Sequence, residues 1–340
     1  MRIRHCRCLA MLCLFVVCCL IPARAADENT TPATAPATEE ATPDAEGRKP
    51  EASEAAAEEE AAVRQIKASL DFYAGVSNME GQRQFRDGFW AGYGLGYPSV
   101  ANLSWDSGTG SSAFISLGLG DYKGQFITEH QPVEAWWKTP VGKTDLTIGK
   151  FWVPFGLYEW EGETKWGVLM EREIGKYNLA ASVNYNDISH NANAYFRASR
   201  SWGENLTLGV SFAGGKGLSY GTVHDRGVGL DLTAAWHGFH LTSEYTVLQH
   251  QSDQRFQFGF AKVSYEKLGK WKPFVSRHTW HDKADELGNF HSTTAGIGYQ
   301  LTPHLGLEAA YAHTPNKGIW WLQTHLTWEK VLRQRKIAGK

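Results

Sequence analysis

From residue 63 onward, apolar and polar residues alternate with a period of two in many segments of the chain. Successive side chains of a β-strand point to opposite faces, so this pattern predicts strands with one apolar face and one polar face. In 204–214 the apolar positions are Leu206, Leu208, Val210 and Phe212, with Thr207 among the residues between them. In three later segments the polar face carries an acidic residue: Asp231, Glu244 or Glu308.

Sixteen segments fit this pattern, and tight turn sequences separate many of them. We expect strands at 67–75, 88–105, 111–120, 125–138, 144–152, 165–174, 177–186, 191–200, 204–214, 226–236, 238–249, 255–266, 271–281, 291–301, 304–313 and 319–329. Pro98 and Pro132 interrupt the second and fourth segments, and proline removes a ladder hydrogen bond, so totals of fourteen or eighteen stay open.

The connections alternate between short and long, which distinguishes two all-β architectures. A soluble sandwich turns its apolar faces inward, whereas a transmembrane barrel turns them outward to lipid around a polar lumen. Short turns at one end and long loops at the other are typical of the barrel, and strands of about ten residues match a tilted crossing of the hydrocarbon layer. We predict an all-β fold, a transmembrane antiparallel β-barrel of about 16 strands.

Tryptophan residues near the ends of predicted strands support the same fold. Trp320 and Trp328 share a strand face, and eight residues at about 3.3 Å each, tilted by about 40°, separate them by roughly 20 Å along the membrane normal. Trp236 and Trp152 also stand at predicted strand ends. We interpret the four as parts of two aromatic girdles at the membrane surfaces.

The first 62 residues differ from the rest. Basic residues, an apolar run over Leu9–Ile21 and the small-x-small sequence Ala23-Arg24-Ala25 predict a cleaved signal peptide over 1–25. All five cysteines lie in it, which excludes thiol chemistry afterwards. A lipoprotein is the alternative, but Cys18 follows Val17 rather than a small residue.

Residues 26–62 hold eleven acids, two bases and no aromatic residue. This composition predicts a disordered periplasmic tether, with a binding tail as the alternative. The barrel is then expected over 63–329, followed by a basic tail over 330–340. The 28 bases and 25 acids of 63–340 leave a charge too small to suggest nucleic acid as a partner.

Two stretches carry a resemblance to a known family. Residues 133–160, VEAWWKTPVGKTDLTIGKFWVPFGLYEW, and 168–173, VLMERE, resemble the strand-turn-strand core of the phosphate-selective porin O/P family. The matching residues are Gly149, Phe151, Pro154, Phe155, Gly156, Met170, Glu171 and Arg172. The resemblance implies a sixteen-stranded diffusion channel that assembles as a homotrimer. The near-neutral barrel has no evident ladder of basic residues, so phosphate selectivity is not carried over.

The third predicted outer loop, 153–164, is a candidate for the pore constriction. Third loops fold into the pore in many sixteen-stranded porins, and this one holds Tyr158 with Glu159, Glu161 and Glu163. Carboxylates at a constriction attract cations and repel anions. The alternative is a solvated acidic loop at the cell surface.

No constellation predicts catalysis or a metal or cofactor site. His237 with His240, and His278 with His281, have a spacing that points the two side chains of a strand to opposite faces. We therefore expect a non-enzymatic channel in the bacterial outer membrane, with outer-membrane lipid and small solutes or ions as partners. A carbohydrate-binding β-protein, secreted or at the cell surface, and an outer-membrane hydrolase are the alternatives.

Overall fold

The computed structural model describes residues 63–78, 83–84, 99–119, 133–157, 164–186, 190–216, 218, 225–249, 255–282 and 289–336. This part of the chain forms one antiparallel sheet. The predicted signal peptide (1–25) and acidic segment (26–62) lie outside the described residues. No helix among the described residues is long and apolar enough to cross a membrane.

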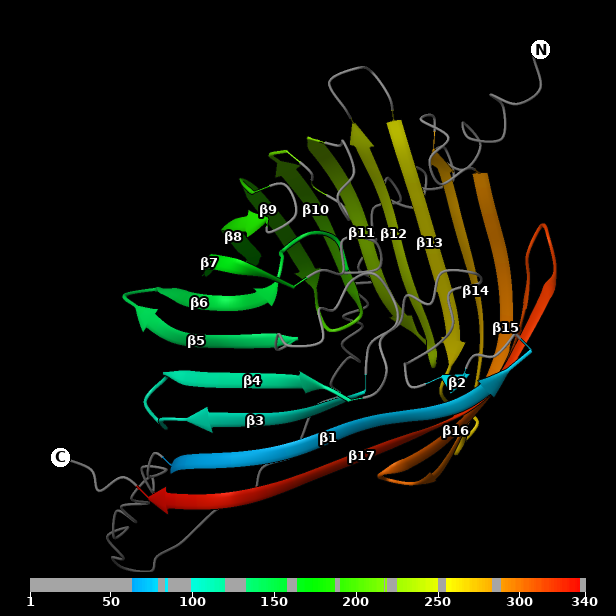
Figure 1. The fold of residues 1–340 in the computed structure, drawn as a ribbon, viewed down its shortest axis with the longest axis horizontal. Helices are drawn as coiled ribbons and strands as arrows, with labels where there is room; N and C mark the ends of the chain where they lie inside the picture. Colours follow the sequence, from blue (N-terminus) through cyan, green and yellow to red (C-terminus); the bar gives the residue numbers. More distant parts are fainter. Residues whose placement is uncertain are drawn as a thin grey trace, which may run out of the picture. The chain divides into compact units, whose positions relative to one another are not determined.

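Sixteen long strands and one of two residues make up the sheet (Figure 1). They are β1 Val63–Ser77, β2 Arg83–Gln84, β3 Val100–Asp106, β4 Ser112–Gly118, β5 Glu134–Val141, β6 Thr144–Trp152, β7 Thr164–Ile174, β8 Tyr177–Asn186, β9 Asn191–Trp202, β10 Leu206–Gly214, β11 Arg226–Trp236, β12 Phe239–Gln249, β13 Arg255–Tyr265, β14 Trp271–Asp282, β15 Asn289–Thr302, β16 Leu305–His313 and β17 Gly318–Lys336.

The long strands close into a barrel. From β3 to β17 each strand pairs with its successor, and β1 joins the two ends by pairing with β3 on one side and with β17 on the other. β1 and β17 accordingly run side by side along their length in Figure 1. The predicted antiparallel barrel of sixteen strands is confirmed, and the short β2 is an addition that pairs only with Gly75 and Val76 of β1.

The two faces of the sheet differ as the alternation predicted. On β11, Leu230 is 40% exposed, whereas its neighbour Asp231 is 1% exposed. The same contrast separates Tyr245 from Glu244 on β12. The apolar side chains therefore cover the outside of the barrel and the polar side chains line its inside, which is the reverse of a soluble sandwich.

The last strand corrects one predicted boundary. The prediction ended the barrel at residue 329 and assigned 330–340 to a separate basic tail, but β17 continues to Lys336. The reason is that β1 begins at Val63, four residues before its predicted start, and supplies backbone partners as far as the pair Val63–Lys336. Residues 337–340 lie outside the described residues.

The predicted strand boundaries agree least with the structure in the two segments that proline interrupts. The described strand within 88–105 is β3, which begins at Val100, and the described strand within 125–138 is β5, which begins at Glu134. Apart from Ser99 and Val133, the remaining parts of both segments, including Pro98 and Pro132, lie outside the described residues.

Short turns join the strands at one end of the barrel, called the turn end here. The tightest of them include the two-residue connection between β11 and β12, where His237 and Gly238 have φ values of 49° and 92°. Positive φ at both positions is the type I′ geometry, whose twist matches the right-handed twist of paired strands. The opposite end, called the loop end, carries the longer connections that begin after β4, β6 and β10.

Candidate pore interior

Residues Val153–Leu157, which follow β6 at the loop end, lie inside the barrel and are called the inward segment here. The ring of Phe155 is fully buried and meets the ring of Tyr195 on β9 edge-on at 6.4 Å. On β11, the inner face offers Gly227 and Gly229, and the Phe155 ring lies within 3.4 Å of where a Cβ at either position would stand. The two glycines thus leave the space that Phe155 occupies.

Hydrogen bonds fix the inward segment to the opposite wall. The backbone N–H of Gly156 donates to Ser211 Oγ on β10 at 2.9 Å, and that of Leu157 donates to Glu244 Oε2 on β12 at 2.8 Å. Thr246 Oγ1 donates to the other oxygen of the Glu244 carboxylate at 3.1 Å. Hydrogen bonds to a charged group contribute about 1.5–3 kcal/mol each, so Glu244 is the main anchor of the segment.

Gly156 is required at its position for two reasons. Its φ is +59°, in the left-handed region that glycine adopts without steric cost. A Cβ added there would also overlap the Glu244 carboxylate. The Pro154-Phe155-Gly156 motif singled out in the sequence therefore has a structural explanation.

The inner wall beside the inward segment is apolar, which the alternation did not predict. Buried side chains from several strands pack in one cluster with the segment: Val153, Phe155, Tyr195, Leu218, Leu248, Phe256, Phe258, Phe260 and Trp280. The sequence contains a pattern that could have predicted this apolar wall, because Phe256, Phe258 and Phe260 stand at every second residue of β13 and so share one face. The inner face is thus apolar where the inward segment covers it, and a second buried apolar cluster lies on β16 and β17.

An ion pair crosses three strands of the inner wall. Arg197 on β9 donates from Nη2 to Asp231 Oδ1 at 2.7 Å and from Nε to Oδ2 at 3.1 Å, although Asp231 is on β11. Gly209 of β10, the strand between them, is opposite Asp231 in the ladder. Any side chain there would overlap the carboxylate. Sequence analysis predicted Asp231 as a pore residue but missed Arg197.

Further charged groups line the inner wall toward the turn end. Lys138 on β5 pairs with Asp145 on β6 at 3.1 Å and with Glu171 on β7 at 2.9 Å. Three strands from β5 around the ring, Asp71 of β1 pairs with His325 of β17 at 2.5 Å. The group around Lys138 thus contains one ammonium and two carboxylates.

A cavity of about 300 Å³ opens on the inner wall between β13 and β1. Gly298 and Gly306 are among the residues that line it, and Lys262 and Lys272 line one side. Glu308 lines the other side and accepts a hydrogen bond from Trp321 Nε1 at 2.9 Å. The cavity therefore carries charges of both signs beside apolar groups such as Phe274 and Leu307.

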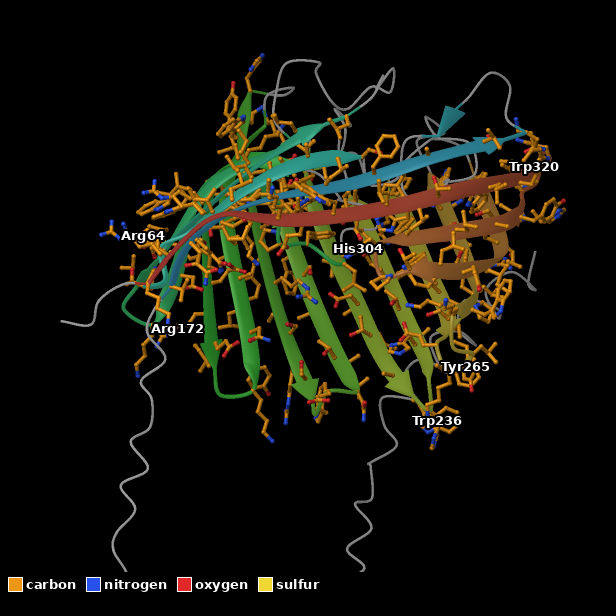
Figure 2. The ribbon with its side chains drawn as sticks, turned by 90° about the horizontal axis from the view of Figure 1, so that it is seen from below. Arg64, Arg172, Trp236, Tyr265, His304 and Trp320 are labelled. Atoms are coloured by element: carbon orange, nitrogen blue, oxygen red, sulfur yellow. The ribbon has the colours of Figure 1, made fainter. Side chains whose placement is uncertain are left out.

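The predicted girdle tryptophans occupy two kinds of environment. Trp236, Trp320 and Trp328 point outward and are 70%, 46% and 46% exposed. Figure 2 shows Trp236 at the tip of its strand and Trp320 at the opposite end of β17 from the Arg64 side. Trp152 is half-buried, and its indole N–H donates to Glu134 Oε1 at 2.9 Å.

Other outward aromatic rings gather at the turn end beside Trp236. Phe239 packs against Tyr265 with ring centres 4.6 Å apart, and Trp271 packs against Tyr299 at 4.4 Å. The guanidinium of Arg200 lies 4.8 Å from the centre of the Trp202 ring. The outward rings thus form a band along this rim, which suits the amphipathic boundary of a membrane.

The predicted constriction residues Tyr158, Glu159, Glu161 and Glu163 lie outside the described residues. The structure places the five residues before them inside the barrel, and Asp231, Glu244 and Glu308 on its inner face. Within the described ranges, no group of three or more His, Cys, Asp or Glu side chains has the arrangement of a metal site.

No family model matches the sequence, and no curated protein matches it. The resemblance to the phosphate-selective porin O/P family therefore stays a prediction.

Solved structures match the fold at low sequence identity. The anion-selective porin from Comamonas acidovorans is 11% identical, with a TM-score of 0.57 over 78% of this chain and 99% of that one. The trimer form of OmpT, an outer membrane protein of Vibrio cholerae, is 10% identical, with a TM-score of 0.56 over 78% and 100%. OmpF of Salmonella typhi, in complex with daunomycin, is 9% identical, with a TM-score of 0.55 over 78% and 97%. The chain thus has the barrel fold of porins.

Proposed function

We propose that the protein is a channel of the bacterial outer membrane, through which small hydrophilic solutes or ions diffuse passively. The observation that carries the proposal is a closed barrel with an apolar outer face and a charged inner face, entered by a loop segment that Glu244 and Ser211 hold in place. Lipid solvates the outside of such a barrel, and its inner charges favour a water-filled passage.

The inward segment narrows this passage at the loop end. Val153 and Phe155 fill the space in front of β9 to β12, so solutes pass beside the segment rather than through the apolar cluster. Several described charges of the wall lie beside a group of opposite sign, as Lys138 does with Glu171 and Arg197 with Asp231, which reduces their net preference for anions or cations. We propose that Glu159, Glu161 and Glu163, which follow the segment, set the selectivity.

Planar-bilayer recording of the refolded mature chain tests the proposal. We expect stepwise conductance that increases with salt concentration, from protein that needs detergent for extraction and migrates differently on gels before and after heating. A heat-modifiable, folded barrel without conductance would contradict the channel. Extraction without detergent would instead favour the carbohydrate-binding alternative.

We further propose that the channel is a homotrimer. The similar OmpT structure is a trimer form, and the family resemblance implies the same assembly. Chemical crosslinking in mild detergent should give a ladder that stops at three chains. A ladder that stops at one chain under conditions that preserve the barrel would contradict this assembly.

The resemblance to the phosphate-selective family does not by itself assign a solute. Gly149 lies so close to the backbone of Ala135 that a Cβ there would overlap it, and Glu171 pairs with Lys138. These motif residues thus have structural roles in the wall. Comparing permeability to phosphate and chloride tests the finer assignment, and a preference for phosphate would support it.

A further inference from the structure

The end of β17 carries positive charges that the proposed channel does not use. Residues 63–68 of β1 pair with residues 330–336 of β17, and we call this two-stranded region the basic ribbon. Every residue from Trp328 to Lys336 is exposed. In Figure 2, Arg64 and Trp320 lie at opposite ends of the paired strands β1 and β17. Gln65 is opposite Asp106, where the short connection from β3 to β4 begins, so the basic ribbon is at the turn end.

Four cations of the ribbon, Arg64, Lys330, Arg333 and Arg335, share its outward face, whereas Lys67 and Lys336 are on the other face. Arg64 is directly opposite Arg335, Ile66 is opposite Arg333, and Ala68 is opposite Lys330. Leu70 and Trp328 form the next pair on the same face, two residues further along each strand. The side chain of Trp328 points outward, so these cations point outward as well.

Apolar side chains adjoin these cations. Ile66 is also opposite Trp105 on β3, so Trp105, Ile66 and Arg333 form one row across three strands. Leu332, at the bulge of the ladder, is 53% exposed. The surface therefore joins guanidinium groups to an indole and a leucine.

These cations have no carboxylate partner among the described residues. Glu329, the nearest acid along β17, pairs with Lys67 on the other face at 3.0 Å. Like charges directly opposite in an antiparallel pair destabilise it, and Arg64 with Arg335 is such a pair. A bound anion would remove this repulsion.

We propose that the outward face of the basic ribbon binds the headgroup of an anionic glycerophospholipid in the leaflet at the turn end. This inference rests on the proposed membrane location. Arginine binds phosphate through two parallel N–H donors, which suits Arg333 and Arg335 for the phosphodiester. Trp105 and Leu332 lie where the glycerol and the first acyl carbons would pass, because indole rings favour the interface between headgroup and hydrocarbon.

Depth in the membrane supports a headgroup rather than a free anion. Trp105 stands in the same row of the sheet as Arg333, so an aromatic ring and a cation are separated by only one strand on the outer face. Clusters of basic residues immediately beside an apolar belt attract anionic lipid.

A second copy of the chain is the competing occupant. β16 pairs with β17 only as far as Leu326, so among the described strands none covers that edge of β17 beyond this residue. Edge strands rich in lysine and arginine resist pairing with another copy through charge repulsion. The same charges attract a phosphate, which favours the lipid.

Native mass spectrometry of the full chain in detergent, titrated with phosphatidylglycerol or phosphatidylcholine, tests the site. We expect phosphatidylglycerol to bind about tenfold more tightly, and the Arg333→Gln, Arg335→Gln variant to lose this preference. The control is Lys267→Gln with Lys270→Gln, which removes two cations from the β13–β14 turn and should keep the preference. Heat-modifiable migration verifies that each barrel is folded.

Several results would overturn the proposal. These are equal binding of the two lipids, an undiminished preference in the arginine variant, or equally tight binding of inorganic phosphate. A dimer that the arginine variant abolishes would assign the edge to a second copy. Conductance separates this inference from the proposed function, because a folded barrel that prefers phosphatidylglycerol but does not conduct would contradict only the channel.

Discussion

The carboxylate of Asp231 on β11 reaches across β10 to the guanidinium of Arg197 on β9 and accepts two hydrogen bonds from it, at 2.7 and 3.1 Å. The two residues are on strands that are not neighbours. Gly209 permits the contact because it has no side chain in the path of the carboxylate. The pair therefore joins three strands of the inner wall beside the anchor of the inward segment.

Removing the carboxylate of this pair should weaken the barrel. Asp231→Ala leaves Arg197 largely buried without its partner, and we expect the free energy of unfolding to fall by about 2–3 kcal/mol. Urea titration of the refolded protein in lipid, followed by tryptophan fluorescence, measures the loss. Asp145→Ala is the control, because Asp145 is half-exposed and shares Lys138 with Glu171, so its loss should be under about 1 kcal/mol. Equal losses would contradict a special role for the buried pair.

Releasing the inward segment should change the behaviour of the open channel. Glu244→Ala removes the acceptor for the Leu157 N–H, and each 1.4 kcal/mol lost raises the population of the displaced segment about tenfold. We expect noisier single-channel currents of higher mean conductance. Thr242→Ala, on the same strand and face but nearer the turn end, is the control. Unchanged currents in a folded Glu244→Ala barrel would show that the segment does not limit the passage.

The acidic residues after the inward segment should control ion selectivity. If Glu159, Glu161 and Glu163 stand at the narrowest point, their field on passing ions exceeds that of carboxylates exposed to salt. Changing all three to glutamine should shift the reversal potential in a salt gradient toward anion preference. An unchanged reversal potential with unchanged conductance would place these residues on the surface, outside the pore.

The two faces of one strand pair should respond differently to a buried charge. Leu230 points outward from β11, and Leu230→Arg should cost about 2–4 kcal/mol if the side chain meets the middle of the bilayer. Thr207 of the neighbouring β10 faces inward and bonds to Ser201 at 2.9 Å, so Thr207→Arg should have a mild effect. Unfolding in lipid vesicles measures both losses, and similar values would contradict the orientation of the barrel.

The local features of the fold could be predicted from the sequence. The period of two is a property of each strand by itself, so it identified the segments, their outward faces and the inner position of Asp231. Prediction was poorest where no local pattern marks an end, as at β17. Seven residues beyond its predicted end are in the strand only because β1 offers them partners.

The contacts that form the pore interior were decided by the tertiary structure. The alternation predicted that Glu244 lies on the polar face of its strand, but nothing near it in the chain indicates that it binds the Leu157 N–H. Arg197 and Asp231 meet only through the register of three strands. The sequence by itself determined that the strands have an apolar and a polar face, because side-chain direction follows from the backbone of each strand. Which inner residues meet depends on how the whole ring closes and how its strands are staggered, and those distant pairings carry no periodic signal in the sequence.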